Sequence, residues 1–209
     1  MAQMNPLENR HVEYLRGHIG AFINTHPNPS LKKGATFLEE SFEIWTLLTV
    51  DLPSAPATNI DLSDFLSNTG RWHHQISQND TPVGYAFSGK ATKFGAAWSL
   101  YGVFISDLAK KLARAIARID QDRPEDDIHA HYVLVPSHKA VFFFLRGPSR
   151  DEVYVVESGG LKSDLEEGKF YRPTDLVRVL STAPRIIGLR SNRIKYRKTS
   201  EKTKKRVSK

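Results

Sequence analysis

The chain has 209 residues, with 30 Lys and Arg, 23 Asp and Glu, and a formal net charge of +7 at pH 7. Its 40% hydrophobic and 25% charged residues are typical of a globular protein, and its length suits one domain. Because the sequence has no cysteine, disulfides, cysteine-ligated zinc, iron–sulfur clusters and thiol nucleophiles are all excluded.

The first elements in chain order are a helix and a segment of mixed pattern. Asn5, Pro6 and Glu8 have the order of an N-cap, a first-turn proline and a capping-box acid, which predicts a helix over about residues 5–25. The apolar residues of segment 36–52 fit both a helical and a strand period. For this segment we expect a helix that leads into a strand.

A β-hairpin, a further strand and a helix follow. Residues 71–87 alternate between apolar and polar around a polar turn at residues 78–81, which predicts two paired strands. An apolar run predicts a strand over residues 98–105. Ser106 is a good cap for a helix over about residues 106–121, whose basic side chains lie opposite an apolar face.

The remaining elements are three strands and a short helix. Turn residues divide segment 129–158 into three apolar strands, and Thr174 opens a helix over about residues 174–181. Consecutive strands joined by turns predict an antiparallel sheet. We therefore expect one α+β domain over residues 1–184, with three to four helices packed on the sheet, and a basic tail over residues 185–209.

The tail carries most of the unbalanced charge. It holds 11 of the Lys and Arg residues and one acid, so residues 1–184 have a net charge of about −3. A segment so charged has too little apolar surface to fold alone, but it attracts polyanions. The residues predicted to contact nucleic acid are Arg190, Arg193, Lys195, Tyr196, Arg197, Lys198, Lys202, Lys204, Lys205 and Arg206.

Within the tail, Tyr196 offers a ring for base stacking while its basic neighbours neutralise phosphates. The mixture of Arg and Lys favours affinity for the backbone without sequence readout. The sequence therefore predicts a non-enzymatic binding or structural module of a larger assembly, whose basic arm contacts nucleic acid or another polyanion. A solubilising tail, an acidic protein partner and an anionic lipid surface are the alternatives.

Histidines form a second candidate site. His129 and His131 are two apart in a predicted strand, so both imidazoles project from one face and suit a metal ion. His74 and Asp127 are candidate additional ligands. This arrangement supports an alternative function, a small metal- or histidine-dependent hydrolase, although histidines at strand ends more often pack or form hydrogen bonds.

Two other motifs bear on function. Gly84 and Lys90 have the spacing of a phosphate-binding loop, but Ala91 stands where Ser or Thr would hold magnesium, and the segment alternates like a strand. Phe142, Phe143 and Phe144 place aromatic bulk on both faces of one strand, which indicates a central strand or, alternatively, a surface for a protein partner.

The sequence also sets expectations for location and cofactors. The segment 1–9 is polar, and the longest apolar run is too short to span a bilayer, so we expect a cytoplasmic protein with no transmembrane segment. We expect nucleic acid or another polyanion and further proteins as partners. No cofactor is predicted apart from the divalent metal considered for His129 and His131.

Overall fold

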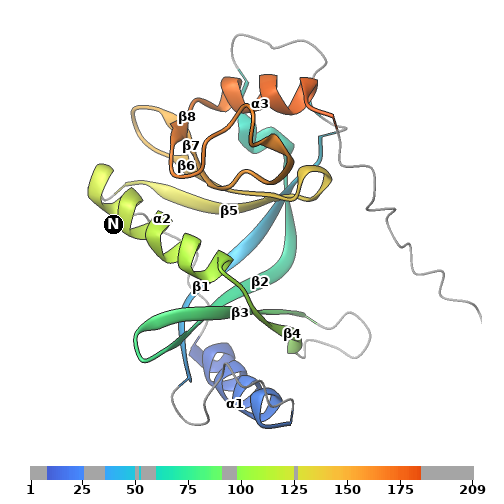
Figure 1. Ribbon diagram of the computed structural model, residues 1–209, viewed down its shortest axis with the longest axis vertical. Helices are drawn as coiled ribbons and strands as arrows, with labels where there is room; N and C mark the ends of the chain where they lie inside the picture. Colours follow the sequence, from blue (N-terminus) through green and yellow to red (C-terminus); the bar gives the residue numbers. More distant parts are fainter. Residues whose placement is uncertain are drawn as a thin grey trace, which may run out of the picture.

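The computed structural model describes residues 9–25, 36–49, 52, 60–90, 98–124 and 127–184. In these ranges the chain forms an eight-stranded, mostly antiparallel sheet with three α-helices, which is an α+β architecture (Figure 1). The elements are α1 (Asn9–Thr25), β1 (Thr36–Leu47), the 3-10 turn η1 (Leu62–Phe65), β2 (Leu66–Gln78), β3 (Thr81–Lys90), β4 (Trp98–Ile105), α2 (Leu108–Asp122), β5 (His129–Val135), η2 (Pro136–His138), β6 (Ala140–Arg146), β7 (Asp151–Glu157), η3 (Gly159–Leu161), β8 (Phe170–Tyr171) and α3 (Pro173–Thr182).

The strand order in the sheet is β4-β3-β2-β1-β5-β6-β7-β8. Every neighbouring pair is antiparallel except β1 and β5, which run parallel over Ile44–Thr46 and Tyr132–Leu134. The fully antiparallel sheet expected from the turns is therefore wrong at this one junction. The chain leaves β1 through the β2–β4 meander and returns through α2, and this long crossover allows β5 to lie parallel to β1.

The segment that we expected to begin as a helix is a strand from its first described residue. β1 pairs with β2 on one side and with β5 on the other, so it is a central strand with neighbours along both edges. Phe42 and Ile44 pack beneath α2, whereas Trp45 and Leu47 pack with the core beneath α3, so apolar residues of β1 serve both faces of the sheet. Tertiary pairing, rather than local propensity, decides its conformation.

Local signals in the sequence explain the other elements well. The β2–β3 turn uses Asn79 and Asp80 at φ of 51° and 57°, a left-handed conformation that these two residue types tolerate. Ser106 Oγ accepts a hydrogen bond from the backbone N–H of Leu108 at 3.1 Å, but the N-cap of α2 is Asp107, so the serine expected to cap the helix lies one residue before it. Pro173, and not Thr174 as expected, begins α3, because a proline in the first turn costs no helical hydrogen bond.

The helices cover both faces of the sheet. The apolar side of α2 packs with Phe42, Ile44, Tyr132 and Phe143 on one face. On the other face, α3 packs with inward residues of β5–β7, and α1 packs with Ile76 and neighbouring residues of β2 and β3. Figure 1 shows α1 beside the β2–β4 end of the sheet and α3 beside the β5–β8 end.

The three phenylalanines of β6 lie inside the molecule. Phe142 and Phe144 belong to the core beneath α3, and Phe143 belongs to the core beneath α2; all three are 0–1% exposed. β6 is thus a central strand that is covered on both faces, and these rings offer no surface to a protein partner. None of the helices in the described ranges combines the length and the hydropathy needed to cross a bilayer.

Candidate functional site

The basic tail lies outside the described residues, so the ten positions predicted to bind nucleic acid have no structural account. The last described residue is Pro184, two residues beyond the end of α3. Thr182 and Pro184 are exposed, so the described part of the chain ends at the surface.

The two histidines of β5 project from the same face of their strand, as predicted. His129 is exposed, whereas the ring of His131 lies 4.9 Å from the Trp45 ring and 6.1 Å from the Phe144 ring. Burial and the neighbouring charge of His129 lower the pKa of His131. Within the described ranges, no group of three or more His, Asp or Glu residues is placed to hold a metal ion. Metal binding at His129 and His131 stays a prediction, which elemental analysis of the purified protein can test.

His74 is not available to complete that site. It is fully buried, its Nδ1 lies 2.8 Å from Ser41 Oγ, and its Nε2 lies 2.6 Å from Ser88 Oγ. Both ring nitrogens are therefore used in a hydrogen-bonded chain that links β1, β2 and β3. Burial lowers the pKa of His74 to about 4, so the ring is neutral at physiological pH.

His73 points to the opposite face, into an aromatic cage beneath α2. Its ring lies 4.7 Å from Tyr85, 5.4 Å from Phe87 and 5.0 Å from Tyr132. It is 0% exposed, and neither ring nitrogen has a hydrogen-bond partner. Burial and the adjacent His74 lower the pKa of His73 to about 3. The buried imidazole is thus held neutral by its surroundings and is closed to solvent.

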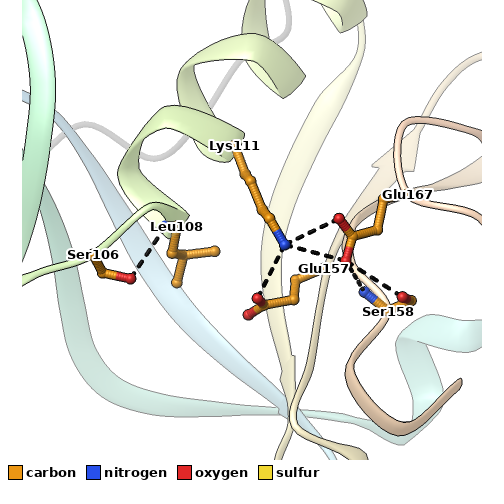
Figure 2. A network of polar contacts seen from close by, with 6 residues as sticks. All are labelled: Ser106, Leu108, Lys111, Glu157, Ser158 and Glu167. Atoms are coloured by element: carbon orange, nitrogen blue, oxygen red, sulfur yellow. Dashed lines mark hydrogen bonds and ion pairs between the residues drawn. The ribbon is translucent and has the colours of Figure 1, made fainter. Parts of the chain in front are cut away.

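A polar network joins α2 to the end of β7. Lys111 Nζ lies 3.1 Å from Glu157 Oε1 and 3.0 Å from Glu167 Oε2, and the Glu167 carboxylate also accepts from Ser158 (Figure 2). Burial alone would lower the pKa of Lys111, but the hydrogen bonds to Glu167 and Glu157 outweigh it and raise the pKa. The Lys111 ammonium is thus paired with two carboxylates, and this network holds α2 against the end of β7.

An open depression of about 820 Å³ lies where β7 and β8 meet the start of α3. Its charged lining includes both signs, from Asp61, Arg150, Asp151, Glu152, Arg172 and Asp175. Glu152 already accepts from Arg123 at 2.6 and 2.9 Å and pairs with Arg150 at 3.2 Å. The lining holds four carboxylates and two guanidinium groups, and Glu152 is already paired with arginine, so this depression does not by itself define a class of ligand.

The near-match to a phosphate-binding loop is part of the sheet. Gly84 lies inside β3, where a side chain would collide with the backbone carbonyl of Phe104 on β4. Close approach of two strands therefore accounts for this glycine. Lys90 is the last residue of the same strand, so the strand–loop–helix context that phosphate binding needs is absent from this segment.

The feature that we did not predict is an exposed aromatic surface on β3 and β4. Tyr101 and Phe104 are 51% and 46% exposed, and the second of them stacks on Tyr85. Alternation of Tyr85 and Phe87 in the sequence was the available signal. It became informative only when the register of β4 was known. Comparison of the chain with family models, curated protein sequences and solved structures finds no match.

Proposed function

We propose that this protein binds nucleic acid or another polyanion through residues 185–209, as a non-enzymatic module of a larger assembly. The observation that carries the proposal is the separation of charge along the chain. Eleven Lys and Arg residues and one acid fall in the last 25 residues, while residues 1–184 have a net charge of about −3. The attraction to a polyanion is therefore concentrated in one segment.

The chemistry of this segment suits a phosphate backbone. Each phosphate neutralised by Lys or Arg releases counterions, and this release supplies affinity that falls steeply as salt is added. Arg193 and Arg197 offer forked donors, and Lys195 and Lys198 offer compact charges on either side of Tyr196. Such a mixture favours contacts to the backbone over contacts that read a sequence.

Truncation separates the basic arm from the folded body. A chain that ends at Gly188 lacks ten of the eleven basic residues of the arm but keeps every described element. We expect it to fold with an unchanged thermal midpoint, and to elute from a phosphate-rich column at much lower salt than the full chain. Equal retention of the two proteins at low salt would contradict the proposal.

A second variant distinguishes charge from length. Replacing the ten basic residues from Arg190 onward with Gln keeps the length of the arm and removes its charge. We expect this variant to behave like the truncated chain, because long-range attraction depends on charge. Retention close to that of the full chain would show that the arm acts by some other contact.

A further inference from the structure

The exposed large hydrophobic side chains gather at one edge of the sheet. Within the described residues they are Leu48, Tyr101, Phe104 and Ile105, and three of these four lie on the edge strand β4. Phe104 pairs in register with Tyr85 of β3; their rings are stacked at 5.3 Å, with an interplanar angle of 29°. Phe87 lies 5.8 Å from Phe104, so rings from two neighbouring strands form one aromatic surface.

A β-bulge brings Tyr101 to this same face. The register of β3 with β4 shifts between Phe87 and Ser88, and the extra residue on β4 is Tyr101. Its ring lies against Gly89 of β3, at 3.0 Å from the place where a Cβ would stand. Gly89 and Phe87 are two apart in β3, so Tyr101 shares the face of Phe87 and Phe104.

Glycine lies under both exposed rings. A Cβ at Gly102 would stand 3.0 Å from the Phe104 ring, as a Cβ at Gly89 would from the Tyr101 ring. Because these two positions lack side chains, the rings can lie close to the backbone and leave their outer surfaces open. Two open aromatic rings at the edge of a sheet are the arrangement on which unpaired bases stack.

The strands around these rings contain basic residues and no acidic ones. β2, β3 and β4 contain no Asp or Glu. Arg71 of β2 lies with its guanidinium 5.4 Å from the centre of the Tyr101 ring, and Lys90 is exposed at the end of β3, where its carbonyl accepts from the Tyr101 hydroxyl at 3.4 Å. Among the described residues, neither cation forms an ion pair with a carboxylate. Arg71 pairs with Gly89 and so lies on the face of the rings, whereas Lys90, the next residue after Gly89, projects from the opposite face. Arg71 is therefore the cation available to a phosphate on this face.

We infer that the face formed by Tyr101, Phe104 and Arg71 is a binding platform for single-stranded nucleic acid, with bases stacked on the two rings. This inference rests on the proposed function and gives it a second contact: the arm supplies attraction to phosphates, and the platform supplies contact with bases. Fully extended, an arm of 25 residues spans about 80 Å, so both can engage one strand. A duplex keeps its bases stacked inside and cannot use the platform in this way.

The test replaces both rings with leucine, in the variant Tyr101→Leu/Phe104→Leu, which keeps apolar bulk and removes the aromatic faces. The ligands are a single-stranded oligothymidylate and an abasic strand of the same length. We expect the double variant to bind oligothymidylate more weakly than the wild type, by about 5- to 30-fold for each ring that is lost, because stacking on one aromatic ring contributes on that scale. Binding of the abasic strand and the salt dependence should not change.

Matched controls identify which proposal fails. Leu48→Ala removes a similarly exposed apolar side chain just beyond the end of β1 and should bind as the wild type does. If wild type and ring variant bind both strands equally, the platform is wrong while the arm stands. If the wild type binds neither strand, the proposed function and the platform both fail. A wild-type dimer that the ring variant loses, with oligonucleotide binding unchanged, would assign the surface to a second copy of the chain.

A measurement on the unmodified chain does not depend on how the variant folds. Ultraviolet cross-linking of the wild type to oligothymidylate, followed by peptide mass analysis, should give adducts on the segment that contains Tyr101 and Phe104. Adducts confined to residues 185–209 would overturn the platform and leave the arm as the sole contact.

Discussion

The burial of His73 should make the stability of the fold depend on pH. In the unfolded chain a histidine has a pKa near 6.5, but in the folded protein burial lowers the pKa of His73 to about 3. Below pH 6.5 the unfolded chain is therefore protonated at this histidine while the folded protein is not. The contribution of the neutral ring to the free energy of unfolding is fully present above pH 6.5. As the pH falls from 6.5 towards 3, it decreases by about 1.4 kcal/mol per pH unit. His74 adds a similar slope down to about pH 4.

Replacing His73 with phenylalanine tests this origin of acid sensitivity. The ring has aromatic neighbours on several sides and no hydrogen bond to lose, so His73→Phe should raise the free energy of unfolding at pH 7 by about 1–2 kcal/mol. The variant should also show roughly half of the wild-type decrease in the free energy of unfolding between pH 6.5 and 4. Urea unfolding at several pH values measures both effects. A pH dependence equal to that of the wild type would show that His73 does not cause it.

At the scale of elements, the Lys111 network holds α2 to the loops that follow β7. Removing the ammonium with Lys111→Met leaves Glu157 and Glu167 facing one another without a cation. Because these side chains are about one third exposed, we expect the free energy of unfolding to fall by about 1 kcal/mol, and added salt should reduce this effect. Urea unfolding of the two proteins at low and high salt measures the difference.

The neighbouring lysine provides a matched control. Lys110 pairs at 3.3 Å with Asp107, whose side chain is 86% exposed, and this pair lies within one turn of the helix. Lys110→Met should change the free energy of unfolding by less than about 0.5 kcal/mol. Equal effects of the two substitutions would indicate that any lysine on α2 contributes by general charge, and that the tie to β7 is not specific.

Elements with strong local signals were predictable from the sequence. The β2–β3 hairpin has a turn of Asn79 and Asp80, β4 has the predicted bounds, and α2 has an apolar stripe and a serine at its start. β1 was not predictable, because pairing on both edges overrides its mixed period. β8 is two residues long and exists only through its pairing with β7, so no periodic signal could reveal it.

The aromatic platform was hidden for a related reason. Tyr85 and Phe87 alternate visibly along β3, but Tyr101 reaches their face only through a bulge, and bulges leave no period in a sequence. The surroundings of His74, a candidate further ligand, could not be read from the sequence either. His73 and His74 are adjacent in the chain, yet strand geometry sends them to opposite faces, where one meets aromatic rings and the other meets two serines.

At the scale of the whole molecule, the proposed function assigns the attraction to phosphates to the basic arm. Shortening the arm step by step should therefore weaken the salt dependence of binding step by step. A chain that ends at Thr203 lacks four cations, and one that ends at Asn192 lacks nine. For single strands the logarithm of the binding constant falls with the logarithm of salt concentration by about 0.7 for each phosphate contact. We therefore expect the slope of the binding constant against salt, on logarithmic scales, to decrease by about 3 for the chain ending at Thr203 and by about 6 for the chain ending at Asn192.

Titration of each chain with oligothymidylate at several salt concentrations measures these slopes. Lys162→Gln, which removes one exposed cation from the body, serves as a control and should leave the slope unchanged. If the first truncation already abolished salt-dependent binding, a discrete terminal site would replace the diffuse arm. If neither truncation changed the slope, the cations that contact phosphate would lie on the body, and Arg71 and Lys90 would be the first to substitute.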